Sequence, residues 1–178
     1  TLDLVVRLMA PILSYTADEI WSYVPGRRAA SVFEAGLPAV EAALLDDALA
    51  AKWERLLAVR TAVTKALEDA RQQGLIGHSL DARVRLAASD GLRPLIEGYR
   101  EFLPELLIVS QVELGADLGD QHVSPLARDL KVAVESARGA KCARCWNYRE
   151  DVGSDAQHPG LCARCVGAVR EAAAAGVE

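Results

Sequence analysis

Two Cys-x-x-Cys pairs constrain this chain more than any other feature of its sequence. Cys142 and Cys145 form the first pair, sixteen residues follow, and Cys162 and Cys165 form the second. This spacing is typical of a zinc site, in which each short turn directs two sulfur atoms at one ion. The 141 residues before the first pair contain no cysteine. The four cysteines therefore serve one local structure, and a shared metal fits them better than two disulfides.

Four thiolates would complete the tetrahedral shell of a closed zinc site and leave no position open for a reacting water molecule. We therefore expect one structural Zn²⁺ that orders this segment, because about 24 residues cannot bury enough apolar surface to fold alone. Two alternatives remain: iron held by the same sulfur atoms, and a site in which His158 replaces a cysteine. The thiols indicate a reducing compartment, so we expect a cytoplasmic protein.

The composition is that of an ordinary globular protein. Of the 178 residues, 51% are hydrophobic and 25% are charged, with a formal net charge of −5; the length allows one domain or two small ones. The longest strongly apolar stretch, residues 106–112, is far shorter than the roughly 18 residues that span a membrane, so we expect no membrane segment. The chain begins at Thr1 without a Met or a signal peptide, which suggests a piece of a longer chain.

Helical periodicity dominates the first part of the chain. Apolar residues recur at intervals of three and four across residues 2–24, which predicts a helix with one buried stripe. Pro11 cannot donate a backbone hydrogen bond, so we expect a kink or a new start there. Thr16 and Glu19 have the spacing of a capping box, which favours a restart at that point. The Pro-Gly pair at 25–26 should end the helix.

A second helix is predicted to begin at Asp46 or Asp47, either of which can cap its first turn, and to end at Gly74. Its apolar residues follow a seven-residue repeat. Arg60 falls on the apolar seam of that repeat. Either its aliphatic part lies along apolar surface while the charge reaches water, or its guanidinium contacts a phosphate.

Beyond residue 77 the pattern changes to that of a small sheet. Residues 82–86 and 130–134 alternate apolar and polar side chains, as half-buried strands do. Residues 106–114 form a short apolar run suited to a buried strand, whereas residues 92–103 return to helical spacing. The order of strand, helix, strand, loop and strand predicts a small α+β module.

Together these patterns predict a mainly α fold with an α+β part. We expect a helical bundle over residues 1–76, a small α+β module over 77–137, a four-cysteine zinc finger over 138–170 and a tail over 171–178. The alanines of that tail are expected to form a frayed helix end.

The zinc segment has a local excess of positive charge. Between residues 138 and 170 there are six basic and three acidic residues, a balance of +3, so the remainder carries −8. Four thiolates and one Zn²⁺ reduce the local excess to about +1, and long-range attraction to nucleic acid would be modest. Trp146 and Tyr148 lie among these charges. Trp146 could stack on an unpaired RNA base or pack over its own metal turn.

Longer patterns agree with a known family. Residues 9–21, which read Met-Ala-Pro-Ile-Leu-Ser-Tyr-Thr-Ala-Asp-Glu-Ile-Trp, resemble the anticodon-binding helical domain of class I synthetases for branched aliphatic amino acids. The pattern from Trp53 to Val84 is similar to the isoleucyl branch, and residues 141–166 resemble the terminal zinc module of those enzymes. Over nearly its whole length, the chain thus resembles the C-terminal part of bacterial-type isoleucyl-tRNA synthetases.

The resemblance implies that the parent enzyme activates isoleucine with ATP, transfers it to tRNA and removes mischarged valine in an editing domain. We expect none of these sites here: no catalytic residue is predicted, and ATP would bind elsewhere in the enzyme. The sequence contains no Gly-x-Gly-x-x-Gly or P-loop pattern. Residues 75–78 are superficially similar to the class I nucleotide-binding signature, but they lack its leading His and follow a helix instead of a strand.

The resemblance also implies two partners, the anticodon stem-loop of isoleucine tRNA and the rest of the synthetase chain. We expect the helical bundle to hold the stem and the zinc module to close over the loop, where unstacked bases can be read. The predicted metal ligands are Cys142, Cys145, Cys162 and Cys165, Trp146 is predicted to stack on a base, and Lys141, Arg144, Arg149 and Arg164 are predicted to contact backbone phosphates.

Two other functions are compatible with the residues. In the first, the zinc module docks onto other domains of its own chain and buries Trp146 and Tyr148 at the junction. In the second, iron held by the four sulfur atoms transfers electrons, which would make the protein coloured. After Val166 the chain departs from many of the enzymes it resembles, because residues 167–178 are alanine-rich where those enzymes continue with a Gly-rich, basic and aromatic tail.

Overall fold

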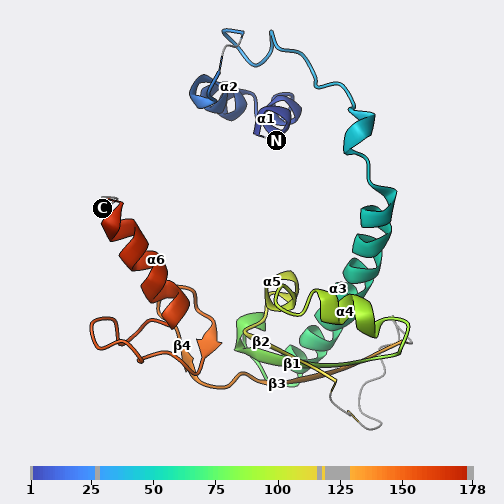
Figure 1. Ribbon diagram of the computed structural model, residues 1–178, viewed down its shortest axis with the longest axis vertical. Helices are drawn as coiled ribbons and strands as arrows, with labels where there is room; N and C mark the ends of the chain where they lie inside the picture. The colour runs from blue at the N-terminus through green and yellow to red at the C-terminus, as the bar shows by residue number, and fades with distance from the viewer. Residues whose placement is uncertain (1, 27–28, 116–117, 119–128, 176–178) are drawn as a thin grey trace. The chain divides into compact units, whose positions relative to one another are not determined.

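The computed structural model describes residues 2–26, 29–115, 118 and 129–175. Helices and a small sheet form a mixed α+β fold, as the sequence predicts (Figure 1). The chain divides into two compact units, residues 1–46 and 47–178. The domain limits expected from the sequence stay a prediction. No helix among the described residues is both long and apolar enough to cross a membrane.

The first unit contains two short helices, α1 (Leu2–Met9) and α2 (Ser14–Tyr23). The expected interruption near Pro11 is confirmed, because a turn in which Leu13 N–H donates to Met9 O separates the two helices. The prediction that the helix restarts at Thr16 is wrong. The α2 helix begins at Ser14, whose hydroxyl donates to Ala10 O at 3.1 Å, and no side chain caps its N-terminus.

The core of the first unit is small. It consists of six buried residues: Val6, Ala10, Ala17, Trp21, Val24 and Val32. Asp18 fastens the following loop to α2, because its Oδ1 accepts hydrogen bonds from Ser31 Oγ at 2.7 Å and from Val32 N at 3.0 Å. The bond from the Ser31 hydroxyl, followed by that from the Val32 amide, lowers the pKa of the Asp18 carboxyl. A short 3₁₀ helix, η1 (Ala42–Leu44), precedes the second unit.

The second unit is built on a long helix and a three-stranded sheet. The helix α3 (Asp47–Gln72) confirms the predicted second helix. The sheet has the order β2–β1–β3, in which β1 (Ala82–Ala88) pairs parallel with β2 (Gln111–Leu114) and antiparallel with β3 (Leu130–Ser136). A turn of 3₁₀ helix, η2 (Ser79–Asp81), leads into β1.

Helices and sheet share one apolar core. The α3 helix contributes Val59, Val63 and Leu67, and the sheet contributes Val84 and Leu86, among other buried residues. The alternation predicted for residues 82–86 and 130–134 is confirmed, because these residues lie in β1 and β3. Arg60 lies on an exposed part of α3 and donates from Nε to Leu106 O at 3.2 Å. Its guanidinium therefore contacts the neighbouring short helix.

Two predicted elements are wrong in their limits. The helix expected over residues 92–103 is divided into α4 (Arg93–Gly98) and α5 (Leu103–Leu107). The strand expected over 106–114 is limited to β2, since its first two residues complete α5. Pro104 favours this helix start because the first helical positions need no backbone donor. Ile108, with φ 56°, then turns the chain before β2.

The last segment forms a hairpin and a helix beside the sheet. The hairpin strands β4 (Ala140–Lys141) and β5 (Tyr148–Arg149) pair antiparallel. The helix α6 (Ala163–Ala174) follows, and it includes most of the alanines expected in a helix end (Figure 1).

Candidate metal centre

The β4–β5 hairpin contains the first cysteine pair. Cys142 N–H donates to Asn147 O at 2.9 Å, and Trp146 N–H donates back to Cys142 O at 2.9 Å. These bonds close residues 142–147 into a tight turn that directs both thiols to the same side. Trp146 closes this turn in the left-handed region, with φ 64°, a conformation that non-glycine residues seldom adopt.

The second cysteine pair opens a helix. Cys162 is the N-cap of α6, and Val166 N–H donates to Cys162 O at 3.0 Å. Because Cys162 and Cys165 are three residues apart at the start of this helix, their side chains lie on one face. The two turns are also joined by backbone, since Ala143 N–H donates to Gly160 O at 2.9 Å.

The structure brings all four predicted ligands together. Their sulfur atoms lie within 4.8 Å of one another, and all four cysteines are free thiols. Cys142, Cys162 and Cys165 are fully buried. The Sγ atoms of Cys145 and Cys162 are 3.9 Å apart, which is close to the roughly 3.8 Å between sulfur atoms around a tetrahedral ion with 2.3 Å bonds. The cluster therefore has the donor set and the approximate size of a site for one zinc ion.

The pKa values of the clustered thiols are also consistent with a cation site. Burial opposes ionisation of Cys142, but the N–H groups of Cys145, Cys162 and Arg144 lower its pKa to about 6. Burial raises the pKa of Cys162 to about 12; the N–H of Cys165 opposes this rise, whereas the other three thiols add to it. Burial and the neighbouring thiols thus oppose ionisation of Cys162, and a bound divalent ion favours the thiolate form.

His158 does not join this cluster. The metal-ligating group among the described residues contains the four cysteines alone. The backbone N–H of His158 instead donates to Asp155 Oδ1 at 3.1 Å, in a turn between the two cysteine pairs. The alternative in which His158 replaces a cysteine is therefore wrong, since all four cysteines form the group.

Trp146 and Lys141 form an exposed pair beside the metal turn. The side chain of Trp146 is 62% exposed. The ammonium group of Lys141 lies 5.8 Å from the centre of the Trp146 ring, within the range of a cation–π contact. Trp146 is therefore not buried against the described residues of this chain.

The three arginines predicted to contact phosphate have different neighbours. Arg144 Nη1 donates to Cys165 Sγ at 3.8 Å, so its guanidinium faces a metal ligand. Arg149 pairs with Asp151 at 3.4 Å, and Arg164 pairs with Glu105 of α5 at 3.3 Å. The phosphate contacts predicted for them stay a prediction.

Sequence reasoning missed the residues that fix the hairpin in place. Gly139 has φ 88°, and a Cβ atom there would lie 2.4 Å from the carbonyl carbon and oxygen of Arg149. The only sequence feature that could have indicated this close contact is a glycine shortly before the first cysteine pair. Ser110 and Gln111, which contact the hairpin from the start of β2, carry no recognisable pattern in the sequence.

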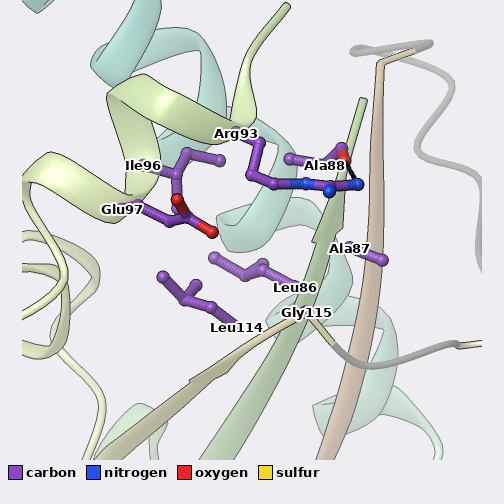
Figure 2. Close-up of a pocket in the computed structure, with 8 residues that line it drawn as sticks. All are labelled: Leu86, Ala87, Ala88, Arg93, Ile96, Glu97, Leu114 and Gly115. Carbon is purple, nitrogen blue, oxygen red and sulfur yellow. Dashed lines mark hydrogen bonds between the residues drawn. The ribbon is translucent and has the colours of Figure 1, made fainter. Parts of the chain in front are cut away.

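A separate cavity of about 280 Å³ lies at the carboxyl ends of β1 and β2, at the end of β1 opposite the zinc segment. Figure 2 shows Arg93 reaching across its edge to donate to Ala88 O, at 3.4 Å. Arg93 also pairs with Asp90 at 3.4 Å. Among the described residues of the lining, Glu97 is the only other polar side chain, so these residues offer no group of metal ligands or nucleophiles.

Comparison with known proteins gives two family matches. The family described as "Anticodon-binding domain of tRNA ligase" matches residues 1–86, and the family described as "Zinc finger found in FPG and IleRS" matches residues 139–167. The second match contains all four clustered cysteines. Together with their geometry, it identifies one structural zinc ion as the cofactor of this segment.

Several isoleucine–tRNA ligases are similar to nearly the whole chain. The protein from Syntrophotalea carbinolica is 51% identical over 166 residues, which cover 93% of this chain and 18% of the relative. That from Geobacter sulfurreducens is 45% identical and covers 95% of the chain and 18% of the relative. The protein from Desulfovibrio desulfuricans is 46% identical, and the match covers 95% of this chain and 19% of the relative. The chain spans less than a fifth of the length of these relatives.

Removal of zinc should unfold the zinc segment and leave the sheet intact. Metal binding contributes on the order of 10 kcal/mol to the folding of such sites, whereas β1 and β3 pack in a separate apolar core. Hydrogen exchange with and without a chelator measures this. We expect residues 139–167 to lose protection after chelation, while Val84 and Val132 keep theirs. Full protection of residues 139–167 without metal would contradict the prediction.

Replacement of Gly139 by alanine should destabilise the zinc segment. The left-handed backbone alone costs a non-glycine residue about 1–2 kcal/mol, and the new Cβ atom would overlap the Arg149 carbonyl. Competition with a chelator measures the resulting loss of zinc affinity. Gly167→Ala is the matched control, because no atom lies within 4 Å of its Cβ position in α6. We expect this control to be neutral or up to about 1 kcal/mol stabilising; equal effects would refute the steric argument.

Proposed function

Because the chain belongs to the isoleucine–tRNA ligase family, we propose that it is a tRNA-binding segment of such an enzyme and recognises the anticodon stem and loop of isoleucine tRNA. The catalytic region would lie elsewhere in the enzyme and would use ATP and isoleucine. The segment would act in the cytoplasm, beside the rest of the synthetase chain.

The observation that carries this proposal is the position of Trp146. A metal-held turn keeps this residue in a left-handed conformation, and its side chain is 62% exposed. Holding a bulky aromatic residue in this way costs free energy without adding to a core. An exposed aromatic face beside a cation is suited to stacking on an unpaired RNA base.

The cations around Trp146 support contact with the RNA backbone. Lys141 and Arg149 lie on the two strands of the hairpin, one register position apart. The pair between Arg149 and Asp151 joins side chains that are 44% and 34% exposed, so a phosphate can compete for the guanidinium of Arg149. Arg144 faces Cys165, and Arg164 faces Glu105. We therefore favour Lys141 and Arg149 as the first phosphate contacts, with Arg144 and Arg164 as secondary ones.

A purely structural role is the second candidate function. The hydrogen bond that Ser110 accepts from Tyr148, the one that Gln111 donates to Arg138, and the ion pair of Glu105 with Arg164 fasten the zinc segment to the α+β part of the same chain. Such docking would stabilise the enzyme without reading RNA. It leaves the exposure of Trp146 without a purpose, so we rank it below tRNA recognition.

Titration of the zinc-loaded chain with two tRNAs separates these candidates. One is isoleucine tRNA, and the other differs from it only in the anticodon. We expect isoleucine tRNA to bind more tightly, because bases in the loop are stacked and hydrogen-bonded while phosphate contacts are common to both RNAs. Equal affinity for the two tRNAs would favour the structural role.

Trp146→Ala should weaken binding of isoleucine tRNA by roughly 1–3 kcal/mol, the usual contribution of one stacked base. Zinc content should not change, because the side chain is exposed and no metal ligand is lost. Trp146→Phe is the matched variant, since it keeps an aromatic face and should retain most of the affinity. If Trp146→Ala binds as tightly as the unsubstituted chain, Trp146 does not contact RNA.

A further inference from the structure

Ser110 is a buried hydroxyl that joins three separate segments. It is 8% exposed, one of two buried polar or charged residues among those that the structure describes. Its Oγ donates to Leu80 O at 2.5 Å and accepts a hydrogen bond from Tyr148 N at 2.7 Å. One side chain thus links η2, the start of β2 and the strand β5 of the zinc segment.

Gln111, the next residue, holds the chain just before the opposite strand of the hairpin. Its Nε2 donates to Arg138 O at 2.9 Å, and its Oε1 accepts from Arg138 N at 3.0 Å. Arg138 lies just before β4, whereas Tyr148 begins β5. Two neighbouring side chains therefore fix both ends of the segment that contains the first metal turn and Trp146.

Few other contacts among the described residues define the orientation of this segment; one is the backbone bond from Ala137 N–H to Asp81 O at 2.7 Å, just before it. The strands β4 and β5 are two residues long each. The zinc ion fixes the two cysteine turns relative to each other, but none of its ligands comes from the sheet. The ion pair between Arg164 and Glu105 joins two side chains that are 59% and 64% exposed, and such pairs contribute little.

We propose that Ser110, supported by Gln111, is a positioning residue for RNA recognition. Its two hydrogen bonds set the angle at which the β4–β5 hairpin leaves the sheet, and this angle directs the ring of Trp146 towards the base on which it stacks. Ser110 touches neither zinc nor RNA in this role. The inference rests on the proposed function, because it assigns a geometric requirement to the same binding surface.

Hydrogen exchange of the zinc-loaded chain tests the anchor without RNA. In Ser110→Ala, the N–H of Tyr148 loses its acceptor, and we expect its exchange to accelerate about 10-fold or more. The N–H of Cys142, which donates to Asn147 within the turn, should stay protected, and zinc content should remain complete. Ser110→Thr keeps a hydroxyl and should restore protection. Unchanged exchange at Tyr148 in Ser110→Ala would overturn the proposal.

Ser89→Ala is the matched control for this experiment. Ser89 is exposed and follows β1 at the end opposite Leu80, so the same chemical change is made in the same unit without touching the anchor. If Ser110→Ala does not fold, Gln111→Ala is the second variant. In this variant the N–H of Arg138 loses its acceptor, and we expect its hydrogen exchange to accelerate. Equal protection of Arg138 in Gln111→Ala and in the unsubstituted chain would overturn the proposal as well.

The positioning role is tested by combining substitutions. Trp146→Ala should reduce affinity for isoleucine tRNA about 10-fold in the unsubstituted chain, but less than about 2-fold when Ser110→Ala is already present. If Ser110 had only a structural role, Ser110→Ala would lower stability, and Trp146→Ala would reduce the affinity by the same factor with and without it. This result would overturn the inference but leave the proposed function standing. No binding of isoleucine tRNA by the unsubstituted chain would overturn the proposed function and this inference together, whereas the exchange result would still decide whether the anchor exists.

Discussion

The zinc–thiolate cluster is the interaction on which the C-terminal segment depends. Its core consists of Cys142, Cys162 and Cys165, with only Cys145, Val152 and Leu161 partly buried against them. Nearly every buried side chain is thus a metal ligand, and hydrophobic burial alone cannot order such a segment. The ion replaces an apolar core. Because a tetrahedral shell fixes both cysteine turns at once, it also holds Trp146 in a conformation that an unsupported loop would not keep.

Features with a short-range cause could be predicted from the sequence. The spacing of the cysteines and the periodicity of α3, β1 and β3 identify these elements correctly, because each depends on residues within a few positions of one another. Residues 92–114 show where this fails. Pro104 gives a local reason for a new helix start, but the left-handed Ile108 lies beside the bond from Arg60 to Leu106 O, whose partners are 46 residues apart. Such tertiary contacts leave no local pattern.

The two Cys-Ala-Arg-Cys sequences show the same limit at the candidate site. Arg144 and Arg164 occupy identical positions in them, and sequence alone gives both the same role. The first sequence closes a hairpin turn, so Arg144 faces the sulfur of Cys165. The second begins α6, so Arg164 reaches Glu105, which is 59 residues away in the chain. The residue that follows each pair, Trp146 in one and Val166 in the other, belongs to a different backbone structure, and this difference decides where the arginine points.

Charge places a limit on how this surface can bind RNA. The chain carries −5 overall, and the zinc segment carries +3 before its thiolates and metal are counted, so general attraction to a polyanion is weak. Affinity then has to come from contacts that need close fit, such as a stacked base and a few well-placed phosphates. Close fit in turn requires that the aromatic ring be held at a defined angle. An anchor of hydrogen bonds between the hairpin and the sheet, centred on the buried side chain of Ser110, meets this requirement, whereas added surface charge would strengthen binding to every RNA alike.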